Sequence, residues 1–227
     1  MPVTNLVWLT SSSATFTDED KAAMERALGA QAEWVARNVP SAPRGRDARG
    51  VGLFRQVEDP RVVLETAHWE STEQHLAWLA SDEYKASSAA LVPHFLLDQI
   101  EYFHLDVDVF SGDGDGDGDG DGKVPLLKSP VVSVGRVTVA ADRKEDLAKA
   151  WEGGKGVLEA FAKPHVVRSG WRKQKADPDT EESVFFIGWP AVERHAELAK
   201  TEDFVKYATP LLSFAKTNDV KHYRRVL

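Results

Sequence analysis

The sequence predicts an α+β protein built from two tandem β-α-β-β-α-β modules. Three anchor residues of the first half recur at the same spacing about 120 residues later. They are Trp69, His75 and Tyr84, matched by Trp189, His195 and Phe204. A tract of alternating Gly and Asp, residues 112–122, lies between the two copies. Because such a tract cannot bury apolar surface, we expect residues 107–129 to be a flexible linker between modules 1–106 and 130–227.

In the first half, β-prone apolar runs alternate with amphipathic segments. Thr17 with Asp20, and Ser71 with Gln74, have the spacing of a capping box at a helix N-terminus. The turn residues Glu-Asp-Pro between two apolar runs predict a hairpin. The expected strands are 5–10, 51–57, 62–69 and 99–105, and the expected helices follow Thr17 and Ser71, the second running toward Pro93.

The second half repeats this order. Asp142 is the expected N-cap of its first helix, with Glu145 completing the box. The expected strands are 131–139, 165–175, 183–189 and 219–226, and the second helix begins near Ala191. This order is that of ferredoxin-like units, in which both helices cover one face of an antiparallel sheet. The other face of each sheet then carries no helices. We therefore expect two ferredoxin-like modules to form an intramolecular α+β barrel, which is a pseudo-dimer within one chain. Whether two such chains form a homodimer stays open.

Composition and motif searches exclude several classes of protein. The chain has no cysteine, which excludes disulfides and thiolate metal sites and fits a reducing cytosol, so a cytoplasmic location is expected. The net charge is −8 without a basic stripe, so we expect no nucleic acid and no membrane as partner. The Gly/Asp tract lacks the twelfth-position Glu of a calcium loop. No phosphate-binding glycine loop, nucleophile elbow or metal-site histidine pair is found, so we expect neither cofactor nor metal.

Glu65 is the most informative polar residue. It lies mid-strand on the same parity as Val63 and Ala67, and its counterpart in the second half is Phe185, so the position is expected to be buried. A buried carboxyl needs a partner or has a raised pKa, and a pKa near neutrality suits a general base. The alternative is a structural carboxylate paired with Arg55 on the neighbouring strand.

Several histidines and a tyrosine are further candidates. His68 ends the third expected strand and has Gly188 as its counterpart. His75 and His195 are matched, and both a packing role and a functional role stay open. His104 follows Tyr102 by two residues, so both share one strand face, and their expected counterparts are Arg224 and His222. We expect Glu65, His68 and Tyr84 to be catalytic, and Asn5, Trp78, His75, Tyr102 and His104 to bind substrate.

The segment WESTEQHLAWLASDEYKAS, residues 69–87, resembles the signature of the dimeric α+β barrel superfamily. This superfamily includes antibiotic-biosynthesis monooxygenases, heme-degrading monooxygenases, stress-responsive A/B barrel proteins and polyketide cyclases of the olivetolic-acid type. The resemblance covers residues 3–106 and, with more divergence, 130–227. It implies the fold, whereas its members carry out many reactions and some carry out none.

The resemblance also implies site residues. Heme-degrading members use an Asn of the first strand together with a Trp and a His of the second helix. Asn5 and Trp78 resemble the first two of these residues. The position of the His falls on Ser88, so the resemblance implies no heme. In the plant polyketide cyclase, a Tyr and a His of the second helix do the acid/base work. Trp78 and Tyr84 fall at these places, and Tyr84 keeps a hydroxyl that can donate a proton. Its counterpart, Phe204, cannot, so the first half is the better candidate for chemistry.

Together these features favour a cofactor-independent cyclase or isomerase of secondary metabolism. It would act by general acid/base proton transfer on a small, apolar or aromatic, phenolic or polyketide-like substrate. One alternative is a cofactor-free monooxygenase of a phenol or quinol, in which the bound substrate anion itself reacts with oxygen. A second alternative is a non-catalytic small-molecule-binding or stress-responsive module.

Overall fold

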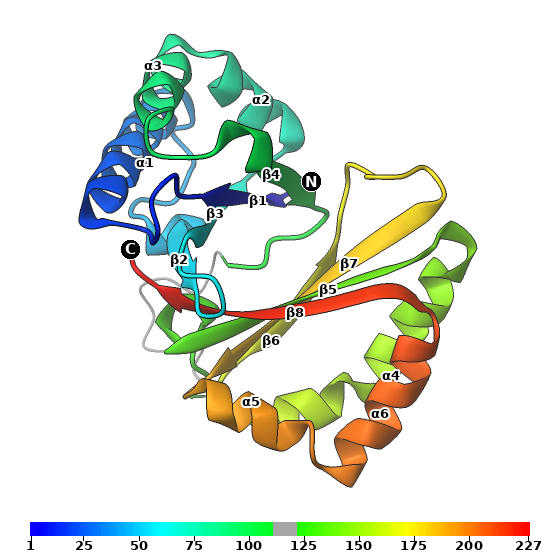
Figure 1. The fold of residues 1–227 in the computed structure, drawn as a ribbon. Helices are drawn as coiled ribbons and strands as arrows, with labels where there is room; N and C mark the ends of the chain where they lie inside the picture. Colours follow the sequence, from blue (N-terminus) through cyan, green and yellow to red (C-terminus); the bar gives the residue numbers. More distant parts are fainter. Residues whose placement is uncertain (111–121) are drawn as a thin grey trace. The chain divides into compact units, whose positions relative to one another are not determined.

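The computed structural model describes residues 1–110 and 122–227 (Figure 1). The chain divides into two compact units. The first unit comprises Met1–Asp115 together with Arg224–Leu227, and the second comprises Gly116–Tyr223. Each unit confirms the predicted α+β class and the predicted order of elements.

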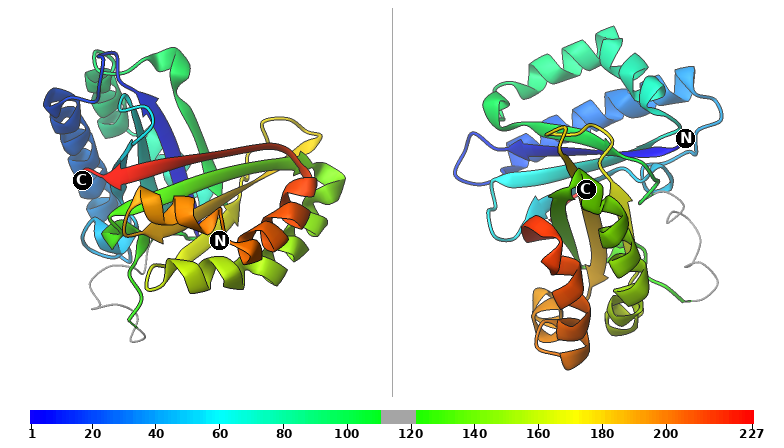
Figure 2. Two further views of the ribbon diagram at one scale, coloured as in Figure 1. Left: turned by 60° about the horizontal axis from the view of Figure 1, so that its bottom comes forward. Right: turned by 90° about the vertical axis from the view of Figure 1, so that its right-hand side faces the viewer.

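The first unit begins with a strand and a long helix. Its strands and helices are β1 (Val3–Thr10), α1 (Asp18–Asn38), β2 (Gly52–Gln56), β3 (Val62–Trp69), α2 (Thr72–Ala80), α3 (Asp82–Leu91) and β4 (Glu101–Leu105). The strands form an antiparallel sheet in the order β4-β1-β3-β2. Helix α1 and the pair α2 and α3 lie on the same side of this sheet (Figure 2), and apolar side chains of β1 and β3 pack against them.

The second unit repeats this arrangement. Its strands and helices are β5 (Val131–Ala140), α4 (Lys144–Ala162), β6 (Val167–Trp171), β7 (Thr180–Trp189), α5 (Val192–Leu198), α6 (Glu202–Ser213) and β8 (Ala215–Arg225). Its strand order is β8-β5-β7-β6, which corresponds strand for strand to that of the first unit. The three helices lie on one side of the strands (Figure 1).

The helix termini agree only in part with the sequence patterns. Thr17 caps α1 and forms the predicted capping box with Asp20. Asp142 is not an N-cap, because a 3-10 turn, Ala141–Arg143, leads into α4 and places Arg143 at the cap. The predicted single second helix is wrong in both units, since Ser81 ends α2 and caps α3, and Thr201 caps α6. Both hydroxyls accept a backbone N–H three residues later, which starts a new helix.

A histidine pair, buried in the first unit and half-buried in the second, connects the second helix to the last strand in each unit. In the first unit, His75 Nδ1 lies 2.7 Å from His104 Nε2, and in the second, His195 Nδ1 lies 2.8 Å from His222 Nε2. His75 stacks on Trp69 and His195 on Trp189, each with 4.8 Å between ring centroids. Burial and the second imidazole lower the pKa of His75 to about 3 and that of His195 to about 4. His75 and His195 are therefore neutral at pH 7, and a neutral imidazole can donate through one ring nitrogen and accept through the other.

The strand register corrects two predicted correspondences. Asn5 is opposite His104 in the first unit, and Ser133 is opposite His222 in the second. His104 therefore corresponds to His222, not to Arg224. By the same register, Tyr102 corresponds to Val220.

The C-terminal residues of the chain belong to the first unit (Figure 1). The backbone N–H of Val226 donates to the carbonyl of Leu53 at 2.8 Å, on the side of β2 that β3 does not occupy. The guanidinium of Arg225 forms an ion pair with Asp47. These contacts complete the edge of the first sheet with residues that follow the whole second module.

The two ends of the predicted linker pack on their own units. Val109 donates its N–H to Thr4 Oγ1 at 2.8 Å, and Phe110 packs against Phe54. In the second unit, Leu126 and Leu127 are buried. Residues 111–121, which include all of the Gly/Asp tract except Gly122, lie outside the described residues, and the role of the tract as a linker stays a prediction. Among the described residues, no helix is long and apolar enough to cross a membrane.

Two glycines of α4 provide a matched test of helix packing. A methyl group at Gly154 would overlap the ring of Tyr207 on α6, whereas one at Gly156 would meet open space. We expect Gly156→Ala to stabilise the protein by roughly 1 kcal/mol, because alanine favours the helix. Gly154→Ala should destabilise it through overpacking. Urea unfolding of both variants measures the difference, and equal effects would contradict the close approach of α4 and α6.

The histidine pairs predict a loss of stability in acid. An imidazole that stays neutral when folded but protonates near pH 6.5 when unfolded makes unfolding easier as the pH falls from about 6.5. The loss should continue until the pH reaches the folded pKa values, about 3 for His75 and about 4 for His195. Urea unfolding between pH 7 and pH 4 measures this slope. His195→Phe should flatten it, and an unchanged slope would contradict a neutral pair.

Candidate functional site

A cavity of about 400 Å³ lies in the first unit, lined by residues of its sheet and its helices. Six of the eight residues predicted from the sequence line it: Asn5, Glu65, His75, Trp78, Tyr84 and Tyr102. The other lining residues are largely apolar, with Gln31 and Ser88 as the polar exceptions. An apolar cavity of this volume with a few converging polar groups is typical of a small-molecule site.

Glu65 lies on the wall of this cavity, in the middle of β3. Strand alternation directs it to the helix side, between its neighbours Val7 on β1 and Leu53 on β2. No hydrogen bond or ion pair joins its carboxyl group to another residue in the described part of the chain, and the predicted alternative partner, Arg55, is exposed. Burial raises the pKa of Glu65 to about 7. The carboxyl group can therefore both accept and release a proton near neutral pH.

Two amide side chains also line the cavity. Asn5 is 2% exposed and Gln31 is 5% exposed. The side-chain oxygens Asn5 Oδ1 and Gln31 Oε1 have no hydrogen-bond partner among the described residues. A buried carbonyl oxygen without a donor is costly in a folded protein, and a ligand hydroxyl is one group that would satisfy it. The predicted place of Asn5 in a binding site fits this geometry.

The break between α2 and α3 positions the aromatic wall. Ser81 Oγ donates to the carbonyl of Trp78 at 2.7 Å and accepts the N–H of Tyr84 at 3.1 Å. The turn places the ring of Tyr84 edge-on to that of Trp78, with 5.6 Å between centroids. Both rings line the cavity, and the Tyr84 hydroxyl has no hydrogen-bond partner in the described part of the chain. The hydroxyl is therefore available to a ligand.

The remaining predicted residues divide between the cavity and its surroundings. Tyr102 is 56% exposed and lies at the rim. His75 lines the wall of the cavity, whereas His104 does not. His104 holds His75 in place through a hydrogen bond between His104 Nε2 and His75 Nδ1. His104 is thus a positioning residue, and its predicted direct contact with substrate is not supported by the geometry.

His68 is not brought into the cavity. It lies on β3 with the parity opposite to that of Glu65, so it faces the other side of the sheet. Its ring nitrogens lie 3.2 Å from Asp108 and 3.5 Å from Glu70. Burial acts to lower the pKa of His68, and the carboxylates of Asp108 and Glu70 act to raise it. The two carboxylates together have the larger effect, so the pKa of His68 is raised. The prediction of His68 as a catalytic partner of Glu65 is therefore not supported by the geometry.

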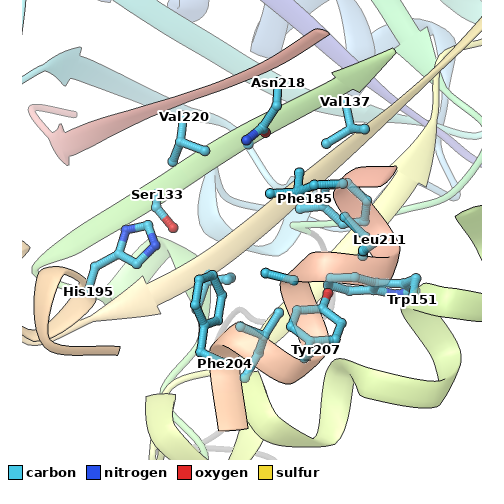
Figure 3. Close-up of a pocket in the computed structure, with 15 residues that line it drawn as sticks. Ser133, Val137, Trp151, Phe185, His195, Phe204, Tyr207, Leu211, Asn218 and Val220 are labelled. Atoms are coloured by element: carbon cyan, nitrogen blue, oxygen red, sulfur yellow. The ribbon is translucent and has the colours of Figure 1, made fainter. Parts of the chain in front are cut away.

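The second unit has a smaller cavity of about 100 Å³ at the equivalent place (Figure 3). Strand register aligns Phe185 with Glu65 and Ser133 with Asn5. Ser133 Oγ accepts the indole N–H of Trp189 at 2.9 Å, whereas the indole nitrogen of Trp69 has no such partner. Because its polar groups are fewer and Phe185 replaces the carboxyl group, this cavity is a weaker candidate for chemistry.

Sequence reasoning did not assign Gln31 to the site. It lies in the apolar row of α1 with Met24, Leu28 and Val35, and a polar residue in such a row is the signal that identifies it. Ser88 lines the cavity at the position where the resemblance to heme-degrading members implies a histidine. A serine hydroxyl is not a heme ligand.

Comparisons with known proteins agree with this geometry. Residues 25–90, from α1 to α3 of the first unit, match the family "Antibiotic biosynthesis monooxygenase". No curated protein matches the chain.

Three solved structures show the same fold over both units. A protein of Fusobacterium nucleatum assigned as a monooxygenase has a TM-score of 0.63 at 9% identity, covering 100% of this chain and 93% of its own. An anthrone oxidase-like protein has a TM-score of 0.59 at 13% identity, covering 100% and 92%. A protein of Lactobacillus acidophilus assigned as a monooxygenase has a TM-score of 0.53 at 13% identity, covering 99% and 93%.

The first unit is similar to the antibiotic-biosynthesis-monooxygenase family over residues 25–90, and both units share the fold of these solved structures.

Proposed function

We propose that the first-unit cavity is the site of a cofactor-free oxygenation of a phenol, a quinol or a similarly acidic aromatic compound. The observation that carries this proposal is Glu65, an unpartnered carboxyl group with a pKa of about 7 on the wall of a largely apolar cavity. The family match in this unit and the two monooxygenase-like neighbours support oxygenation over the other reactions of the fold.

The substrate class follows from the wall. Trp78, Tyr84 and Phe95 offer flat apolar surface, and 400 Å³ suits one compact aromatic molecule. The unpartnered oxygens of Asn5 and Gln31 would accept hydrogen bonds from hydroxyl groups of the substrate. A hydroxylated aromatic compound satisfies both the apolar and the polar parts of the cavity.

In this mechanism Glu65 removes the acidic proton and so generates the substrate anion, which transfers electrons to molecular oxygen. For a phenol, the O–H bond and one ring C–H bond break, and one atom of O₂ becomes the new carbonyl oxygen. The other oxygen atom leaves as water, so the substrate supplies all four electrons and the product is a quinone. Tyr84 is placed to donate a proton to the departing oxygen, and the apolar wall excludes bulk water from the anion.

A second candidate function uses the same residues without oxygen. A base and a hydroxyl donor on one cavity, Glu65 and Tyr84, also suit a proton-transfer cyclisation or isomerisation. This was the leading expectation from the sequence, and the presence of both groups is the observation that favours it. Simple binding without reaction is the remaining outcome.

Oxygen dependence separates these functions. The full-length protein would be incubated with a panel of anthrones, naphthols and polyketide-like phenols, in air, in ¹⁸O₂ and without oxygen, and the products would be analysed by mass spectrometry. A product that gains one labelled oxygen atom and loses two hydrogen atoms supports oxygenation. An isomer or dehydrated product formed equally without oxygen supports the second candidate, and binding without any product contradicts both.

Replacing Glu65 should remove activity without removing the cavity. We expect Glu65→Gln to lower kcat by roughly 10²- to 10⁴-fold, the usual contribution of a general base. In the unmodified protein kcat/KM should rise with pH and level off above about pH 7, where Glu65 is ionised. Glu83→Gln, which removes an exposed carboxyl group of α3, is the control. Full activity of Glu65→Gln would refute the assignment of Glu65 as base.

Glu65 should also lower the stability of the protein at neutral and higher pH. Its pKa is raised on folding, so the folded state binds the proton more tightly, and stability falls as the pH rises from about 4.5 to about 7. Glu65→Gln should remove this loss and unfold at higher urea concentration than the unmodified protein at pH 8. Equal or lower stability of the variant at pH 8 would show that the carboxyl group has a stabilising partner.

A further inference from the structure

The first unit has a second cavity of about 530 Å³, between the C-terminal half of α1 and the segment that follows it. None of its lining residues lines the cavity of Glu65. One wall is apolar, and the other carries three arginines. The residues of this arginine cavity used below are Ala32, Val35, Ala36, Val39, Arg46 and Arg49.

The arginine cavity contains a buried charge without a counter-charge. Arg49 is 6% exposed, and no hydrogen bond or ion pair joins its guanidinium group to any described residue. The acid closest to it in sequence, Asp47, is paired with Arg225. Burial and the nearby Arg46 lower the pKa of Arg49. A guanidinium group stays protonated in proteins, so the cavity holds an uncompensated positive charge.

The backbone keeps these arginines together. Gly45 and Gly50 have φ values of 92° and 59°, in the left-handed region that glycine adopts without strain. Between them the short turn Asp47–Arg49 carries Arg49 into the cavity, with Arg46 half-buried beside it. The positive groups are thus presented by a tightly bent segment, not by a long surface loop.

The wall opposite the arginines is apolar. Ala32, Val35 and Ala36 of α1 and its C-cap residue Val39 follow one another at helical spacing along one stripe. Small side chains at Ala32 and Ala36 leave room beside the larger valines. A ligand that fills the cavity therefore meets an apolar stripe on one side and guanidinium groups on the other.

We propose that the arginine cavity binds an organic anion with a phosphate or carboxylate head and an apolar body. Guanidinium groups bind both heads through paired, charge-assisted hydrogen bonds, which would neutralise Arg49. The apolar body lies on the stripe of α1. This site is separate from the proposed oxygenation site and does not depend on any reaction there.

Titration calorimetry with the full-length protein tests this proposal, using hexyl phosphate, hexanoate, inorganic phosphate and 1-hexanol as probes. At least one of the two hexyl anions should bind with one-to-one stoichiometry, and the stronger one identifies the preferred head. Inorganic phosphate and hexanol should each bind at least about tenfold more weakly, since each lacks one half of the ligand. Affinity should fall with added salt.

Arg49→Met removes the charge but keeps most of the side-chain volume. We expect at least about a tenfold loss of affinity for the hexyl anion, and a Tm of the ligand-free variant that is unchanged or higher, because the uncompensated charge is gone. A purely structural arginine would instead lower the Tm. Arg46→Glu, at a half-buried position, provides a second variant that should abolish binding. Arg55→Met, which removes an exposed arginine of β2, should change neither affinity nor Tm.

Three results would overturn the proposal. Inorganic phosphate that binds as tightly as hexyl phosphate would indicate an adventitious ion only. Hexyl anions that bind equally well to Arg49→Met and Arg46→Glu would place binding elsewhere on the protein. No binding of either hexyl anion to the unmodified protein would show that the cavity does not take this class of ligand.

Discussion

The second helix of each unit is held in place by one pair of imidazoles, buried in the first unit and half-buried in the second. The pair connects this helix to the last strand, and a tryptophan of the third strand stacks on it, so three elements meet at one point. The geometry is the same in both units, although the residues around it have diverged. Since the helix carries Trp78 and is followed by Tyr84, the pair also fixes where the aromatic wall of the cavity stands. Because both units share this pair, the wall residues of the two cavities can differ without moving the helix.

The two cavities differ in the polar groups that line them. In the first unit a carboxyl group and two amide oxygens remain without partners inside the fold, an arrangement that costs stability. In the second unit Phe185 fills the carboxyl position, and Ser133 is satisfied by the indole of Trp189. Polar groups that cost stability without structural benefit are typical of functional sites, and the cavity of the second unit lacks the unpartnered carboxyl group.

Local sequence patterns predict most of the fold and six of the residues that line the cavity. The alternation along β3 placed Glu65 on the helix side, because side-chain direction in a strand depends only on parity. The same parity rule places His68 away from the cavity, because it lies three residues after Glu65 and therefore faces the opposite side of the sheet. The residue of the second unit that corresponds to His104 can be identified only from the strand register. Sequence spacing alone does not give this register, because β4 and β8 differ in length. The helix break at Ser81 was readable in principle, because a serine before two acidic residues is a capping signal.

The return of residues 224–227 to the first unit has a consequence for biosynthesis. Translation adds about 5 to 20 residues per second, so the segment that pairs with β2 emerges on the order of ten seconds after the rest of the first unit. During that interval the edge of β2 is open, and open edges attract wrong strands. The nascent chain therefore passes through a stage at which the first unit lacks residues 224–227, and a ribosome that stalls within the second module would leave an aggregation-prone product.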